Sequence, residues 1–285
     1  MEYRGAKNYL VDLIRAASPP LEAIPALLPE QWVVCDAVPL DGLRAVLFDL
    51  YGTLFISAAG DMASASGGKK EPNAKNKTLA VMDDYFHAEV KKRHNEARAA
   101  GIDWPEVNAE EIWSNYHGPF FSGDHNARET ALRYELAVNP VYPMPGAENA
   151  IRFLKKRGMT LGIISNAQFY SALLFDAFFN TPPEEMGFDS ELLVYSFKAG
   201  VAKPSAVLFN TALAVLAKRG IRPAEALYVG NDMRNDIRGA ADCGMKTCLF
   251  AGDSRSLRLR PGQHGDPDYI VRNLEALTSY ITPPL

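Results

Sequence analysis

The chain has 285 residues, of which 47% are hydrophobic and 22% charged, and its formal net charge at pH 7 is −4. This composition is typical of a soluble globular protein with one large or two modest domains, and it offers no broad basic field for nucleic acid or an anionic membrane. We therefore predict neither a nucleic-acid partner nor a membrane partner. The three cysteines are too few and too scattered for a disulfide framework, so we expect a reducing, cytoplasmic location.

The first segment, residues 1–40, is predicted to be a helical extension. Apolar side chains recur at helical spacing between residues 9 and 14, and the proline pair at 19–20 should end that helix. Asp12 and Arg15 interrupt the apolar stretch, which a secretory signal would not allow. We expect the helix to pack on the body of the protein, and contact with a second copy in a homodimer is the alternative.

Apolar, β-rich runs then alternate with helical patterns. The strongest runs are AVLFDL at 45–50, TLGIIS at 160–165, ALYVG at 226–230 and KTCLF at 246–250, with weaker runs at 191–196 and 268–271. Helical patterns lie at 146–158, 204–220 and 235–244. Continuous apolar strands that alternate with helices predict an α/β fold, in which a doubly wound parallel sheet is covered on both faces.

The segment 57–143 breaks this alternation. It opens with small, polar and charged residues at 57–77, which predict a flexible loop. Helical patterns follow, including ARETALRYELAV at 127–138. We predict that this segment is an inserted, all-helical cap over the strand ends, and that residues 41–56 and 144–285 form the core domain.

Polar side chains close three of the predicted strands. Asp49 ends the first run, Ser165 and Asn166 end the second, and Asn231 and Asp232 follow the third. Each alone would be an ordinary turn residue. Ligands of doubly wound sheets bind beyond the carboxyl ends of the strands, so the three together predict a functional site at that edge.

Four motifs resemble those of the haloacid dehalogenase superfamily, and they occur in that superfamily's order. They are FDLYGTL at 48–54, IISN at 163–166, the pair Lys203-Pro204, and VGNDMRND at 229–236. The likeness extends from about residue 44 to residue 282. It implies a Rossmann-like core with a cap inserted after the first strand, and a hydrolase that uses an aspartate nucleophile.

The residues themselves suit that chemistry. Asp49 would attack phosphorus or carbon and form a covalent aspartyl intermediate. Lys203 would offset the repulsion between carboxylate and phosphate, while Thr53 and Ser165 would donate hydrogen bonds to the transferring group. The predicted catalytic residues are Asp49, Tyr51, Thr53, Ser165, Asn166 and Lys203.

Magnesium is the predicted cofactor, because Mg²⁺ prefers a few carboxylates together with water. Its predicted ligands are Asp49, Tyr51 through the main-chain carbonyl that the resemblance implies, Asn231, Asp232 and Asp236. Either Asn231 or Asp232 takes the usual position of the first acid, and the sequence leaves both open. The acids of this loop would repel Asp49 and one another without a cation.

Tyr51 is the departure from the pattern. Phosphatases that resemble this superfamily carry a second aspartate there, which protonates the leaving group and activates water. A general acid contributes about 10²–10⁴-fold, and a tyrosine with a reference pKa of about 10 replaces it poorly. Aryl or acyl phosphates, whose leaving groups need no proton, would be the better substrates.

Three functions follow from this mixed motif set. The favoured one is Mg²⁺-dependent hydrolysis of a small phosphorylated metabolite, because the acidic loop suits a metal. A metal-independent 2-haloacid dehalogenase is the first alternative, since its first motif resembles DxYGTL and a halide leaves without a proton. A catalytically idle binding protein is the second. It is disfavoured because nothing in the fold requires the complete set of polar residues.

Overall fold

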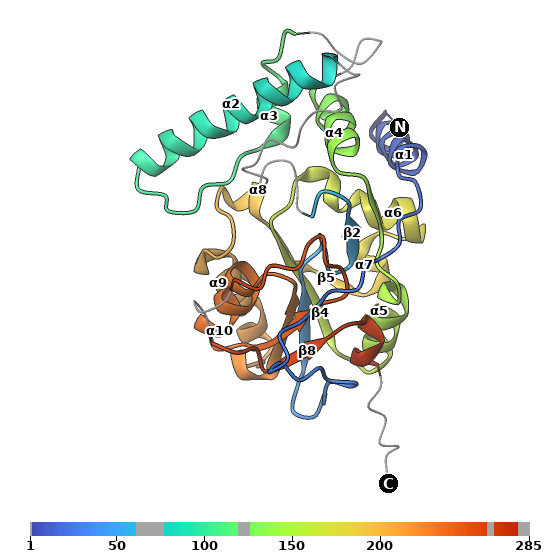
Figure 1. Cartoon of the computed structure of the whole chain (residues 1–285), viewed down its shortest axis with the longest axis vertical. Helices are drawn as coiled ribbons and strands as arrows, with labels where there is room; N and C mark the ends of the chain where they lie inside the picture. Colours follow the sequence, from blue (N-terminus) through green and yellow to red (C-terminus); the bar gives the residue numbers. More distant parts are fainter. Residues whose placement is uncertain (1, 61–76, 119–125, 261–264, 279–285) are drawn as a thin grey trace.

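The computed structural model describes residues 2–60, 77–118, 126–260 and 265–278 (Figure 1). Within these ranges a six-stranded sheet has the order β5-β4-β1-β6-β7-β8, and every neighbouring pair is parallel. Its strands are β1 (Ala45–Phe48), β4 (Thr160–Ser165), β5 (Phe188–Tyr195), β6 (Ala226–Gly230), β7 (Lys246–Phe250) and β8 (Tyr269–Val271). The predicted doubly wound, parallel α/β sheet is confirmed.

The central strand β1 positions the candidate site. It lies between β4 and β6, with Phe48 opposite Ile163 on one side and Val229 on the other. All four of its residues are buried, as expected for a strand that is covered on both faces. Burying a side chain as large as Leu47 or Phe48 contributes about 1.5–3 kcal/mol. This burial anchors the strand end that Asp49 follows.

Helices cover the sheet close to where the sequence predicts them. They include α5 (Ala147–Lys156) and α9 (Ala206–Lys218), with the shorter α6 (Leu173–Phe179), α7 (Pro183–Met186), α8 (Ser196–Ala199), η1 (Phe169–Ser171), η2 (Pro223–Glu225) and η4 (Leu274–Leu277). The predicted helices at 146–158 and 204–220 are therefore confirmed.

The predicted helix at 235–244 has a different form. A π-helical turn, η3 (Met233–Arg238), comes first, and α10 (Gly239–Asp242) follows it. The wider turn arises because the N–H of Ile237 donates to the carbonyl of Asp232, five residues back, at 3.1 Å. The Asp232 side chain caps the same turn.

A short antiparallel ribbon, which the sequence analysis did not predict, ties together the two ends of the insertion. It consists of β2 (Phe55–Ser57) and β3 (Val141–Pro143), with Ser57 opposite Val141. Three residues are too few to establish a strand periodicity, so the pattern was not visible in the sequence. In this ribbon the chain leaves the core domain and returns to it at one place. The pairing supports the predicted domain boundaries near residues 57 and 143, which stay a proposal.

The described part of the insertion is mostly helical, and its assignment as a separate cap domain stays a prediction. Its helices are α2 (Lys77–Ala99), α3 (Ala109–Trp113) and α4 (Ala127–Val138), and α2 and α3 lie at one end of the molecule (Figure 1). Aromatic rings hold them together, with Phe86 stacked on Trp113 at 5.5 Å between ring centroids. Most of the predicted flexible loop at 57–77, residues 61–76, lies outside the described residues.

The first helix, α1 (Glu2–Ala17), packs on the body of the protein as expected. It lies beside α4 and α6 (Figure 1), with Leu10 and Ile14 buried. The helix ends before the proline pair at 19–20. No helix among the described residues combines the length and the apolar character that crossing a membrane requires.

Candidate active site

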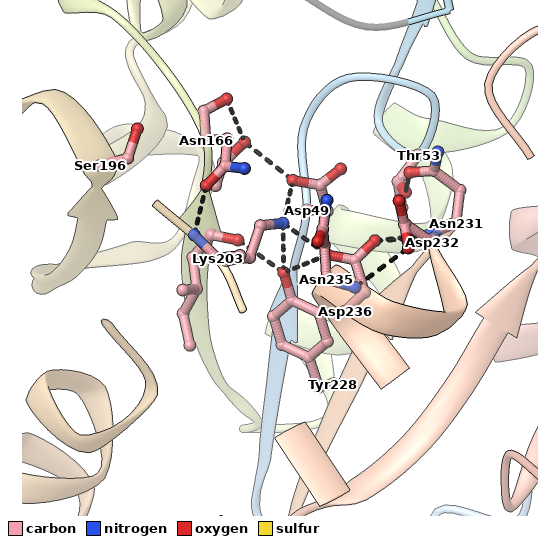
Figure 2. Close-up of polar contacts among 12 residues, drawn as sticks. Asp49, Thr53, Asn166, Ser196, Lys203, Tyr228, Asn231, Asp232, Asn235 and Asp236 are labelled. Carbon is pink, nitrogen blue, oxygen red and sulfur yellow. Dashed lines mark hydrogen bonds and ion pairs between the residues drawn. The ribbon is translucent and has the colours of Figure 1, made fainter. Parts of the chain in front are cut away.

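Asp49 occupies the turn that follows β1. Its N–H donates to the carbonyl of Val229 at 2.9 Å, which continues the parallel pairing one residue past the strand. Its Oδ1 accepts hydrogen bonds from Ser165 Oγ at 2.8 Å and Lys203 Nζ at 2.6 Å (Figure 2). The side chain is 9% exposed and lines a cleft, so the carboxylate is not sealed beneath the core.

Lys203 uses all three donors of its ammonium group. Besides Asp49, Nζ contacts Asp236 Oδ1 at 2.5 Å and Tyr228 Oη at 3.0 Å. Burial alone would lower the pKa of Lys203, but the charges of Asp236 and Asp49 outweigh burial and hold that pKa well above its ordinary value. The ammonium therefore remains charged next to the candidate nucleophile.

Tyr228 orients this lysine. Its phenol donates to the carbonyl of Ile164 at 2.6 Å and so presents its oxygen lone pairs to the Lys203 ammonium (Figure 2). Sequence analysis did not identify Tyr228. Its signal was a single hydroxyl-bearing side chain in the otherwise apolar strand ALYVG.

Asp236 connects the lysine to the acidic loop. Its Oδ2 accepts the main-chain N–H groups of Asn231 and Asp232, each at 2.9 Å. Burial raises the pKa of Asp236 to about 7; Lys203 opposes this rise, whereas the charges of Asp49 and Asp232 add to it. Both of its oxygens are thus engaged within the protein.

Asp232 turns toward a different cation. Its carboxylate accepts the N–H groups of Arg234 and Asn235 and forms an ion pair with Arg260 at 3.0 Å. Burial would raise the pKa of Asp232, but Arg260 and these N–H groups outweigh burial and lower it. The protein itself, through Lys203 and Arg260, therefore supplies part of the positive charge that the acidic residues were expected to require.

Asn231 lies between the loop that follows β1 and the loop that follows β7. Its Oδ1 accepts from Thr53 Oγ1 at 3.1 Å, and its Nδ2 donates to the carbonyl of Ser256 at 2.7 Å. Thr53 and Ser165 are fully buried, and their hydroxyls bond to protein side chains in this arrangement. A direct role for either hydroxyl toward substrate stays a prediction.

Asn166 also belongs to the assembled group. Its Oδ1 accepts the main-chain N–H of Lys203 at 2.7 Å, which ties the end of β4 to the lysine loop. The structure thus brings the predicted site residues to one edge of the sheet, at the ends of β1, β4 and β6 and on the loop that carries Lys203. Figure 2 shows most of them together, including Asp49, Asn166 and Lys203.

The cleft at this edge is small, with a volume of about 30 Å³. Its lining includes Asp49, Tyr51, Asn166, Lys203, Asn231 and Asp232. That space is enough for an ion or for one or two water molecules, by the measure that a single water needs about 10–15 Å³.

Tyr51 directs its phenol to the core rather than to a catalytic partner. Its Oη lies 2.9 Å from Ser171 Oγ, in the 3₁₀ turn η1. Burial raises the pKa of Tyr51 well above its ordinary value, and the charges of Glu135 and Asp49 raise it further, although the bond with Ser171 lowers it. A phenol held this way keeps its proton and does not replace a general acid and base near neutral pH.

The donor set is compatible with magnesium. Within the described ranges no three His, Cys, Asp or Glu side chains gather as a metal-binding group. The cleft is nevertheless lined by the carboxylates of Asp49 and Asp232 and by the carboxamide of Asn231. Mg²⁺ binds oxygen ligands and often takes only one or two carboxylates with several waters, so these residues fit it.

A loop that sequence analysis missed closes one side of the site. Gly52 has φ of +82°, and a Cβ there would lie 2.4 Å from the side chain of Ser256. The loop after β7 therefore rests directly against the turn that follows β1, and only glycine allows that approach. Residues 251–260 carry no motif, so no local pattern in the sequence indicated this contact.

Several known proteins are similar to this chain. The family model described as haloacid dehalogenase-like hydrolase matches residues 43–244, which is most of the chain. A glyceraldehyde 3-phosphate phosphatase of Pyrococcus furiosus is 30% identical over 160 residues, which cover 54% of this chain and 56% of that protein. A ribulose-1,5-bisphosphate 5-phosphatase of Halopiger xanaduensis is 27% identical over 145 residues, covering 49% and 56%.

A solved structure is also similar, the CbbY protein of Rhodobacter sphaeroides in complex with phosphate. It is 18% identical, with a TM-score of 0.48, and the match covers 81% of this chain and 95% of that one. The chain spans about half the length of the curated relatives it matches. On the family match, the chain belongs to the haloacid dehalogenase-like hydrolases.

Proposed function

We propose that this haloacid dehalogenase-like hydrolase removes phosphate from a small phosphorylated metabolite, with Asp49 as nucleophile and Mg²⁺ as cofactor. The observation that carries the proposal is the Lys203 ammonium, which holds Asp49 Oδ1 at 2.6 Å at the edge of an oxygen-lined cleft. Both curated relatives described above are named as phosphatases, which supports hydrolysis of a phosphorylated metabolite.

In the first step the Asp49 carboxylate attacks phosphorus. Ser165 and Lys203 both hold Oδ1, which fixes the plane of the carboxylate. The new bond joins a carboxylate oxygen of Asp49 to phosphorus while the bond from phosphorus to the leaving oxygen breaks. Water then attacks phosphorus: its OH group becomes part of inorganic phosphate, its other proton passes to the phosphate or to solvent, and the bond from phosphorus to the Asp49 oxygen breaks, which restores the carboxylate.

The state of Tyr51 defines the class of leaving group. Because its buried phenol keeps its proton and bonds to Ser171, no general acid stands at the position where related phosphatases carry one. An alkoxide leaves poorly without a proton, whereas an aryl oxide or a carboxylate leaves readily. We therefore propose aryl or acyl phosphates, or esters that supply their own proton, as the preferred substrates.

Magnesium would be held by the Asp49 carboxylate, the Asn231 carboxamide oxygen and the main-chain carbonyl of Tyr51. When bound, it would neutralise charge on the transferring phosphoryl group. The site would still need this cation, because the single ammonium of Lys203 pairs with the two carboxylates of Asp49 and Asp236. The three side chains therefore carry excess negative charge before a phosphate binds.

The test is Mg²⁺-dependent release of p-nitrophenol from p-nitrophenyl phosphate. We expect activity in the wild type, its loss on chelation, and its loss in Asp49→Asn. The matched control is Asp268→Asn, which removes a carboxylate that pairs with Lys246 away from the cleft and should keep the activity. Equal activity in Asp49→Asn and wild type would refute the assignment of the nucleophile.

A second candidate function is favoured by the same phenol. A halide leaves without a proton, so a buried Tyr51 is compatible with metal-independent 2-haloacid dehalogenation. Release of chloride from L-2-chloropropionate in the presence of chelator, without phosphatase activity, would select this function. If neither a broad phosphate panel nor haloacids are turned over, the catalytically idle binding protein is the function that remains.

A further inference from the structure

We propose that Arg258 is a specificity residue of this site, and that the substrate carries a second oxyanion, a carboxylate or a phosphate, besides the phosphate that reacts. This inference rests on the proposed phosphate hydrolysis at Asp49. It concerns the loop after β7, to which no sequence motif pointed, and it follows from three features of that loop.

The first feature is the position of Arg258. It lines the same cleft as Asp49 and Lys203. Its main-chain N–H donates to the carbonyl of Asn231 at 3.0 Å, and its carbonyl accepts from Met233 at 2.9 Å. These two bonds fix the loop to the acidic loop, so the arginine is held at the cleft by main-chain geometry.

The second feature is how the guanidinium is held. It donates to the carbonyls of Arg255 at 2.8 Å, Leu257 at 3.2 Å and Gly60 at 3.4 Å. A Cβ on Gly60 would lie 2.8 Å from Nη2 of Arg258 and closer still to the carbonyl of Arg255. The half-buried guanidinium is therefore oriented by neutral groups from two segments of the chain.

The third feature is charge. Arg255 pairs with Asp253, and Arg260 pairs with Asp232, each at 3.0 Å. Arg258 forms no ion pair with a carboxylate in the part of the chain that the structure describes. A guanidinium that is oriented but not neutralised binds a carboxylate or phosphate strongly, because its planar fork matches two oxygens.

Matched aryl phosphates test this inference. The substrates are 3-carboxyphenyl phosphate, its neutral isostere 3-carbamoylphenyl phosphate, and 1,3-phenylene bisphosphate, all with leaving groups that need no proton. We expect kcat/KM of the wild type to favour at least one charged compound over the amide by about 10-fold or more, the effect of one charge-assisted ion pair. The preferred charged compound identifies the oxyanion as carboxylate or phosphate.

Variants assign that preference to the residue. Arg258→Gln should reduce the ratio of kcat/KM for the preferred charged compound to kcat/KM for the neutral amide to near unity. Arg258→Lys should keep part of that preference. The matched control, Arg238→Gln, removes an exposed arginine that pairs with Asp242, and it should keep the full ratio. A wild-type ratio near unity, or an unchanged ratio in Arg258→Gln, overturns the inference.

Binding separates this inference from the proposed function. Calorimetry with Asp49→Asn measures the affinity for the same three compounds without turnover. If the wild type releases no phosphate but binding still favours a charged compound and loses that preference with Arg258→Gln, hydrolysis is refuted and the oxyanion site stands. If binding shows no preference that depends on Arg258, the oxyanion site is refuted whatever the activity.

Discussion

The substitution Asn231→Asp tests how the acidic loop would hold a metal. In the structure Asn231 Nδ2 donates to the carbonyl of Ser256 at 2.7 Å, and Oδ1 accepts from Thr53 at 3.1 Å. The substitution keeps the second bond, removes the first and places a carboxylate oxygen against a buried carbonyl oxygen. It also adds a negative charge close to Asp49 and Asp236.

The expected cost without metal follows from these contacts. A lost hydrogen bond costs about 1 kcal/mol, and an unpaired buried acceptor costs about 1–3 kcal/mol more. A total of about 2–4 kcal/mol corresponds to a fall in Tm of about 3–7 °C for a chain of this size. With Mg²⁺ present, the new carboxylate becomes a metal ligand. Half-saturation should then occur at an Mg²⁺ concentration about 10-fold lower, which corresponds to about 1.4 kcal/mol of additional binding free energy.

Thermal melting across a Mg²⁺ titration, together with the Mg²⁺ dependence of p-nitrophenol release, measures both effects. The matched control is Asn235→Asp, which adds the same charge in the same turn. Asn235 Oδ1 accepts from Arg234 Nε at 3.1 Å, a role that a carboxylate keeps, so small changes are expected. If the half-saturation of Asn231→Asp by Mg²⁺ is unchanged, the assignment of Asn231 as a ligand is refuted. If the variant is as stable as wild type without metal, the cost attributed to the lost bond with Ser256 is refuted.

Three further predictions concern the same network. Tyr51→Phe should retain turnover of aryl phosphates. Tyr51→Asp should regain a general acid and so raise the ratio of alkyl to aryl phosphate turnover by about 10²-fold. An unchanged ratio in Tyr51→Asp counts against this account. Tyr228→Phe should lower the unfolding free energy in urea by about 1–3 kcal/mol and lower kcat more than it changes KM, because one donor of the Lys203 ammonium and the carbonyl of Ile164 lose their partner; a selective rise in KM would contradict this role. Because the folded pKa of Asp236 is about 7 against an ordinary 3.8, its stabilising contribution is complete at low pH and is lost as pH rises through 7. The unfolding free energy of the wild type, measured relative to Asp236→Asn, should therefore decrease as the pH rises from about 3.8 to about 7. Parallel pH profiles of the two proteins would be inconsistent with the raised pKa.

The sheet and the place of the site were predictable because they depend on local patterns. The run that contains β1 is apolar on both faces, as expected for a parallel strand that is covered on both sides. The polar residues at the ends of β1, β4 and β6 meet because parallel strands end at one edge of the sheet. The short ribbon of β2 and β3 was not predictable, since three residues do not establish a period.

The partners of the site residues were harder to predict than the residues themselves. Asp232 and Asp236 stand four residues apart, yet one pairs with Arg260 and the other with Lys203. That division depends on the π-helical turn and on a loop more than 20 residues later in the chain. Likewise, the contact between Tyr51 and Ser171 joins segments 120 residues apart, for which the sequence offers no spacing rule.

The most direct test is to identify the covalent intermediate. Excess wild-type protein is mixed with phosphate-labelled aryl phosphate and Mg²⁺, quenched in acid within one turnover, digested and analysed by mass spectrometry. The account predicts a labelled acyl phosphate on Asp49 that forms before free phosphate appears, and no label in Asp49→Asn. Free phosphate released without a labelled protein, or a label on another side chain, would contradict it.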